Sequence, residues 1–131
     1  MDPWTEQALQ LLEAGARDQA AVHILARVPE APHEIILFHA QQAMEKSLKS
    51  VLSVRQVVFR RTHDLLELQR IMEQHGIYPP VSTDLLLRLG PYAVEFRYLG
   101  APAPDVGIDE AIEGMTATME WAKQQVGHVT G

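Results

Sequence analysis

The sequence predicts an all-α protein, an antiparallel up-and-down four-helix bundle with an additional C-terminal helix. Three observations predict this fold. Apolar residues recur at spacings of three and four in each long segment, which is the period of a helix packed on one side. No segment alternates apolar and polar residues over a useful length, so no β-sheet is expected. Prolines and glycines divide the chain into helices joined by short links, which favour antiparallel neighbours.

The first helix is expected over residues 4–28, where the apolar positions are Leu9, Leu12, Ala16, Ala20, Ile24 and Val28. Pro3 suits a first helical turn, and Gly15 lowers helix propensity enough to allow a bend. Pro29 and Pro32 end this helix and begin the next. The two helices should therefore form a hairpin.

The second helix, over residues 35–52, is the most cleanly amphipathic segment. One face of its helical wheel holds the predicted core residues Ile36, Leu37, Ala40, Ala43, Met44, Leu48, Val51 and Leu52. The other face holds His39, Gln42, Glu45, Lys46 and Lys49, which present hydrogen-bonding groups one turn apart. This polar face is either a binding surface for an anion or a partner, or an ordinary solvated face.

Residues 53–61 have no helical order and predict a connector whose apolar side chains, Val54, Val57, Val58 and Phe59, pack against the bundle. Thr62 is expected to cap a third helix that ends at His75 and Gly76, with Asp64 in its first turn. His63 and Asp64 also invite an acid–base interpretation. Capping explains them better, because adjacent residues of a helix do not face each other.

A fourth helix should begin at Ser82 or Thr83 and continue through Phe96. Gly90 and Pro91 lie inside it, so a kink or break is expected near residues 87–90 that can shape a pocket. After a loop over residues 100–104, a last helix is expected over residues 107–126. Its predicted core face is Ile108, Ala111, Ile112, Met115, Met119 and Ala122.

The composition bounds the class of protein. A chain of 131 residues is expected to form a single domain, residues 1–131. The absence of cysteine excludes disulfides and thiolate chemistry, and no histidine spacing typical of a metal site occurs, so no metal or cofactor is expected. The acidic first residues do not resemble a secretory signal, and no apolar run suits a membrane span, which predicts a cytoplasmic protein. A net charge of -6 argues against a wide nucleic-acid surface but allows a local basic patch.

Three ordered blocks resemble the HEPN domain family, small helical proteins also described as nucleotidyltransferase substrate-binding domains. Residues 38–49 read FHAQQAMEKSLK, residues 62–65 read THDL, and residues 92–98 read YAVEFRY, similar to the family's three signatures. The blocks and their flanking helices cover almost the whole chain. One position departs from the family, because Leu99 replaces the proline usual after Arg-Tyr, so Gly100 and Pro102 must end that helix.

The resemblance implies a homodimer that binds a nucleotide or RNA phosphate and acts as the partner of a minimal nucleotidyltransferase, in a toxin–antitoxin-like pair. The homodimer is also physically reasonable because Val57, Val58, Phe59 and Phe96 are many apolar residues for so few helices. The candidate ligand-binding residues are His39, Gln42, Lys46, Lys49, Tyr92, Glu95, Arg97 and Tyr98. For the last group, the alternative is an Arg97–Glu95 ion pair and a Tyr98 that closes the bundle.

Two other functions stay open: a ribonuclease toxin with a divergent active site, and a ligand-free structural dimer or adaptor. Family members that cut RNA resemble one another in an Arg-x(4–6)-His motif late in the domain. Here that spacing occurs at Arg17 and His23, at Arg27 and His33, and at Arg70 and His75, none of them in the fourth helix. Such spacings also arise by chance, so no catalytic residue is assigned and the protein is expected not to cut RNA by itself.

Overall fold

The computed structural model describes residues 1–93 and 105–130 of the chain. Its elements are α1 (Pro3–Leu25), α2 (His33–Val54), α3 (Leu65–Gln74), α4 (Thr83–Leu89), a 3-10 helix η1 (Gly90–Ala93) and α6 (Ile108–Thr130). The predicted all-α bundle is confirmed, and the described ranges contain no strand. In these same ranges, no helix is both long and apolar enough to cross a membrane.

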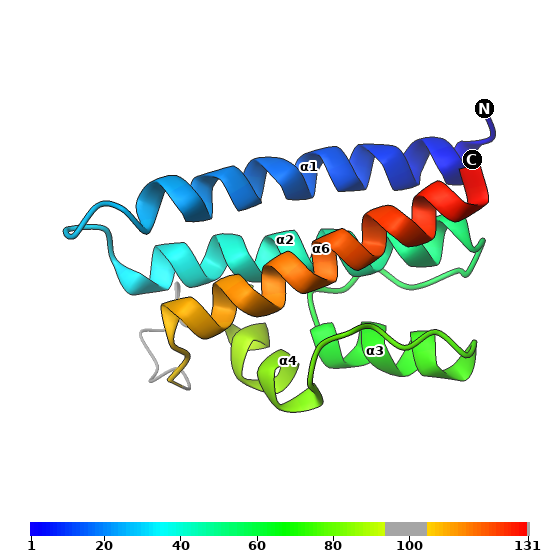
Figure 1. The fold of residues 1–131 in the computed structure, drawn as a ribbon. Helices are drawn as coiled ribbons and strands as arrows, with labels where there is room; N and C mark the ends of the chain where they lie inside the picture. The colour runs from blue at the N-terminus through cyan, green and yellow to red at the C-terminus, as the bar shows by residue number, and fades with distance from the viewer. Residues whose placement is uncertain (94–104, 131) are drawn as a thin grey trace.

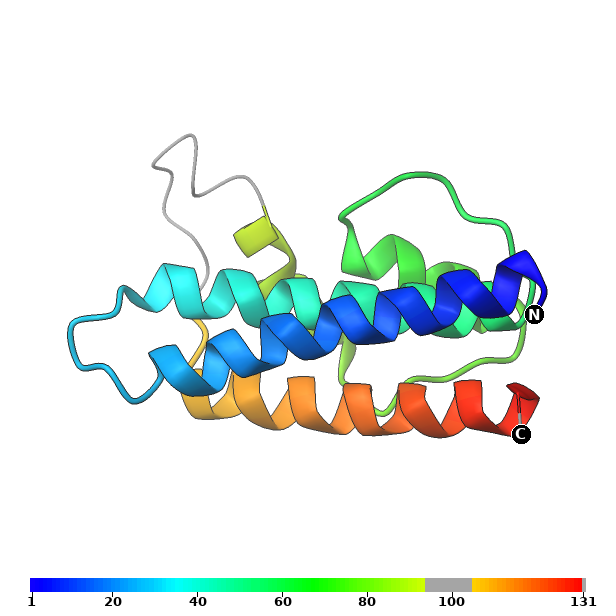
Figure 2. The ribbon, with the colours of Figure 1, turned by 90° about the horizontal axis from the view of Figure 1, so that it is seen from above.

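The long helices α1, α2 and α6 lie side by side, and the short helices α3 and α4 pack below them (Figure 1). Helix α2 is central, because it contacts α1, α3, η1 and α6. Seen from above, α1 and α6 run along neighbouring sides of the molecule in opposite directions (Figure 2). All eight predicted core residues of α2 are buried.

The helix ends follow from capping chemistry, with one correction to the prediction. Asp64, not Thr62, is the N-cap of α3, and its Oδ1 accepts hydrogen bonds from the amides of Leu66 and Glu67 at 3.0 and 3.3 Å. Thr62 Oγ1 instead accepts from the amide of Asp64 at 3.0 Å, which fixes the approach to the cap. Ser82 caps α4 as predicted, and its Oγ accepts from Leu85 N at 3.1 Å.

The predicted break at Gly90 is confirmed. Helix α4 ends at Leu89 and the chain continues as the 3-10 helix η1, since Pro91 has no N–H for an α-helical hydrogen bond. The predicted extension of this helix through Val94 and Phe96 falls on residues 94–104, outside the described ranges.

The connector between α2 and α3, residues 55–64, differs from the prediction in part. Val54 still belongs to α2 and is buried, because the helix ends two residues later than expected. Val57 is buried and Phe59 packs against the core, as predicted. Val58 is 80% exposed, so it does not pack against the bundle.

The predicted core face of α1 is wrong at several positions. Leu12 and Ala16 pack against the core as predicted, but the helix ends at Leu25 and the other predicted positions are exposed: Leu9, Ala20, Ile24 and Val28. The buried stripe consists of Thr5, Ala8, Gly15, Asp18 and Val22. Small residues dominate this stripe because α1 lies close to α2: a Cβ atom on Gly15 would lie 3.4 Å from the carbonyl oxygen of Ala43.

This close approach gives a graded expectation for Gly15. Gly15→Ala should leave the free energy of unfolding unchanged or raise it by up to about 1 kcal/mol, because alanine fits and favours the helix. Gly15→Leu should lower it by about 1 to 3 kcal/mol, because the side chain must push α1 away from α2. Urea unfolding of both variants tests this, and equal stabilities would contradict the close contact.

Candidate functional site

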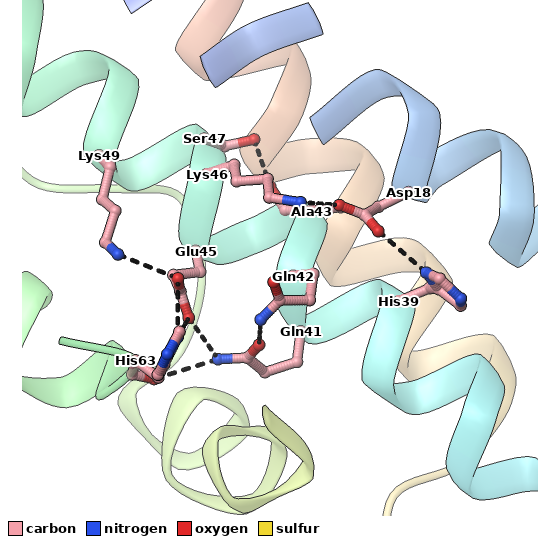
Figure 3. Close-up of polar contacts among 10 residues, drawn as sticks. All are labelled: Asp18, His39, Gln41, Gln42, Ala43, Glu45, Lys46, Ser47, Lys49 and His63. Carbon is pink, nitrogen blue, oxygen red and sulfur yellow. Dashed lines mark hydrogen bonds and ion pairs between the residues drawn. The ribbon is translucent and has the colours of Figure 1, made fainter. Parts of the chain in front are cut away.

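The polar residues of α2 form two clusters on different sides of the helix (Figure 3). The first is the Asp18 cluster, Asp18 with His39 and Lys46. Asp18 Oδ2 accepts from Lys46 Nζ at 2.5 Å, and Asp18 Oδ1 lies 2.9 Å from His39 Nδ1. The Asp18 side chain is only 12% exposed, and that of Lys46 is 27% exposed. Two predicted ligand-binding residues therefore already bind a carboxylate of α1.

The second is the Glu45 cluster, Glu45 with Gln41, Gln42, Lys49 and His63. The Glu45 side chain is 4% exposed, and its Oε2 accepts from Lys49 Nζ at 3.0 Å. Its Oε1 accepts from Gln41 Nε2 at 3.2 Å and lies 3.1 Å from His63 Nδ1. A buried carboxylate needs such partners, because an unpaired charge in the interior is costly.

The two glutamines complete the Glu45 cluster. Gln41 Nε2 also donates to the backbone carbonyl of His63 at 3.1 Å, and Gln42 Nε2 donates to Gln41 Oε1 at 2.7 Å. Gln41 is fully buried. Residues 38–49, the first sequence block, thus hold residues 62–65, the second block, in place through Gln41 and Glu45. The predicted ligand residues Gln42 and Lys49 donate hydrogen bonds to Gln41 and Glu45.

Of the predicted residues in the third block, the structure describes only Tyr92. It lies in η1 and is buried against the core, and burial, with the nearby carboxylates of Asp105 and Glu34, raises the pKa of its hydroxyl. Glu95, Arg97 and Tyr98 lie outside the described residues. A ligand site that joins them to α2 therefore stays a prediction.

Arg88 forms a contact that the sequence did not single out. It donates from Nη1 and Nη2 to the two carboxylate oxygens of Glu110, each at 2.8 Å, and from Nε to Asp84 at 2.9 Å. It also donates to the carbonyl of Asp105 at 3.2 Å. The hydrogen bonds to Glu110 and Asp84 hold the pKa of Arg88 above its ordinary value and that of Glu110 below. Arg88 thereby joins α4 to the start of α6.

Two pockets flank the Glu45 cluster. The His63 pocket, about 420 Å³, is lined by Thr62, His63, Asp64 and Leu66 and by Leu86, Leu87, Gly90, Pro91 and Ala93. The Trp4 pocket, about 480 Å³, is lined by Trp4, Gln7 and Leu11 of α1, Lys49 of α2, and Val57, Val58, Phe59 and Arg61 of the connector. Both volumes fall within the range of about 300 to 1,000 Å³ typical of small-molecule sites. Gly90 and Pro91, where the helix breaks, line the His63 pocket, as expected of a break that shapes a pocket.

The pockets differ in charge. The Trp4 pocket is lined by two cations, Lys49 and Arg61, and by no carboxylate. A third pocket, of about 290 Å³, is lined by Glu110 and Glu113 and by no cation. In a chain with a net charge of -6, the Trp4 pocket thus combines the exposed Arg61 with a lysine that is paired with Glu45 from behind. An anion is the ligand that this lining favours.

The Arg-to-His spacings found in the sequence lie outside the three pockets. The exposed Arg17 side chain bonds Glu13 at 3.4 Å, and His75 Nδ1 lies 2.9 Å from the carbonyl of Ile71. None of the six residues lines the three pockets. Within residues 1–93 and 105–130, no three His, Asp or Glu side chains are grouped so that they could hold a metal ion.

Comparison with known proteins gives one match. The family model described as the HEPN domain matches residues 3–125, nearly the whole chain. No curated protein and no solved structure matches the chain significantly.

Proposed function

The chain belongs to the HEPN domain family, and we propose that it binds a nucleotide or an RNA phosphate and acts as the partner of a minimal nucleotidyltransferase, as in a toxin–antitoxin pair. Family membership supports a nucleotide- or RNA-related function. The observation that best supports phosphate binding is the pair of cations, Lys49 and Arg61, that line the Trp4 pocket. Lys49 belongs to the first sequence block, and Arg61 stands directly before the second.

The contacts in the Asp18 cluster and the Glu45 cluster indicate which cations a phosphate can reach. Lys46 and Lys49 each donate one of their three N–H groups to a carboxylate, that of Asp18 and that of Glu45, so each of them already has a counter-charge. Arg61 is exposed, so it is the cation that a phosphate in this pocket reaches most directly. Arg97 is a further proposed contact, resting on the sequence resemblance alone.

The expected test result is weaker ligand binding when Arg61 is removed. Arg61→Ala should weaken binding of a labelled RNA or of ATP by roughly tenfold or more, because a charge-assisted hydrogen bond to phosphate is lost. Arg55→Ala is the matched control, since Arg55 is an exposed arginine of the same connector that does not line the pocket. Titration at several salt concentrations should also give a shallower salt dependence for Arg61→Ala. Equal affinities of the two variants would reject Arg61 as a phosphate contact.

The ribonuclease alternative is favoured by one observation. His63 lines a pocket, its side chain is 58% exposed, and its Nδ1 faces the buried carboxylate of Glu45, an arrangement that can orient an imidazole for proton transfer. The same RNA titration decides between the two functions. RNA that stays intact with the lone protein supports binding without cleavage, and RNA cut by the lone protein but not by His63→Ala supports the ribonuclease.

The partner is tested separately. A nucleotidyltransferase encoded beside this chain should co-purify with it, and lack of any complex with that enzyme would reject the partnership while leaving ligand binding untouched.

We also propose a homodimer, but the exposed apolar residues that support it are not all those expected from the sequence. Val57 is in the core and Phe59 packs against it, so they are not spare apolar surface, but Val58 and Leu87 are exposed. Sedimentation at micromolar concentration should give a species of twice 14.7 kDa. A single species of 14.7 kDa would contradict the dimer.

A further inference from the structure

We propose that the Trp4 pocket is a binding site for one unpaired nucleobase together with its phosphate, so that the ligand is a mononucleotide or a single-stranded RNA end and not an RNA duplex. This inference rests on the proposed function and adds the form of the ligand to it. It depends on the residue types that the pocket combines, which come from α1, α2 and the connector.

The pocket pairs aromatic surface with positive charge. Trp4 and Phe59 line it beside Lys49 and Arg61. Aromatic rings bind bases by stacking, and cations bind the phosphate, and this combination is the usual chemistry of single-strand binding. Bases in a duplex are stacked on each other, so they cannot reach such rings without unpairing.

The fold holds in place the backbone of Trp4 and the side chain of Phe59. The buried Ser53 hydroxyl donates to the backbone carbonyl of Trp4 at 2.9 Å and lies 2.8 Å from Gln7 Oε1. This contact ties the first turn of α1 to the end of α2. Phe59 is partly buried and packs against the core. A preformed wall loses little entropy when the ligand binds, which favours affinity.

The charged wall is also positioned. The Lys49 side chain is 14% exposed, and its bond to the buried Glu45 fixes where its ammonium lies. Neither the His63 pocket nor the pocket lined by Glu110 combines two cations with two aromatic rings. Of the three pockets, the Trp4 pocket therefore matches both the base and the phosphate of a nucleotide.

The experiment uses Trp4 as its own reporter. The chain has two tryptophans, so the full-length Trp121→Phe protein leaves Trp4 as the only source of tryptophan fluorescence. Titration with AMP, with a short single-stranded RNA and with a matched RNA duplex should give saturable quenching for the first two and none for the duplex. In a fluorescence-anisotropy titration with labelled single-stranded RNA, Trp4→Leu should weaken binding by roughly tenfold or more.

The outcomes separate this inference from the proposed function. If single strand and duplex bind equally, Trp4→Leu changes nothing and Arg61→Ala still weakens binding, the pocket recognises phosphate alone and the nucleobase site is rejected. If no RNA or nucleotide binds, the proposed function falls as well. If binding is lost in Arg55→Ala and kept in Arg61→Ala, the site lies elsewhere and the inference is wrong. Circular dichroism of each variant checks that the fold is retained.

Discussion

Replacing Glu45 with alanine should lower the free energy of unfolding by about 3 to 5 kcal/mol. The carboxylate is almost fully buried and is the shared partner of Lys49, Gln41 and His63. Its removal leaves the mostly buried Lys49 ammonium without this acceptor and loosens the connector. For a domain whose total stability is about 5 to 15 kcal/mol, such a loss is severe.

Urea unfolding followed by circular dichroism measures this effect. Glu13→Ala is the control, because Glu13 lies on the exposed surface and pairs only with the exposed Arg17, so its loss should change stability by less than about 1 kcal/mol. Glu45→Gln should fall between the two, since it keeps the shape and one acceptor oxygen but loses the charge. A Glu45→Ala protein as stable as Glu13→Ala would show that the Glu45 cluster contributes no net stability.

Replacing Asp18 with alanine should lower the free energy of unfolding by about 2 to 3 kcal/mol. Asp18 is the carboxylate of α1 that holds both Lys46 and His39 of α2. The expected loss is smaller than for Glu45 because Lys46 is 27% exposed, so water partly replaces the missing partner.

A double-mutant cycle isolates this contact. The single variants Asp18→Ala and Lys46→Ala and the double variant should show an interaction energy of roughly 1 kcal/mol or more. The double variant Asp18→Leu with Lys46→Met should recover most of the lost stability, because a buried ion pair can often be replaced by apolar residues of similar size. Strictly additive single effects would contradict a direct contribution of the ion pair.

The sequence predicted the core better than it predicted the polar contacts. The apolar face of α2 is correct at every position, because its large residues give a strong helical period. The face of α1 is correct at Leu12 and Ala16 and wrong at its other positions, because its buried stripe is made of small residues that weigh little in a hydrophobic pattern. The available signal was the seven-residue repeat of Ala8, Gly15 and Val22, with Asp18 in the same stripe.

The polar residues of α2 were identified from the sequence, but the residues that they contact were not. A helical wheel places Glu45 on the polar side of α2, yet Glu45 is buried because the connector passes back over this side and brings His63 to it. One helix alone cannot show that contact. Trp4, Phe59 and Arg61 were missed for the same reason, since they come from distant segments that meet only at the Trp4 pocket.

Glu45 is a single carboxylate that serves two pockets. Its Oε2 accepts from Lys49 of the Trp4 pocket, and both of its oxygens lie within 3.2 Å of Nδ1 of His63, which lines the His63 pocket. A ligand that contacts the Lys49 ammonium and a ligand that contacts the His63 ring therefore act on the same buried carboxylate. Thermodynamic linkage makes such a coupling reciprocal: occupancy of either pocket changes the binding free energy at the other by the same amount. The two pockets would then respond to their ligands as one allosteric unit.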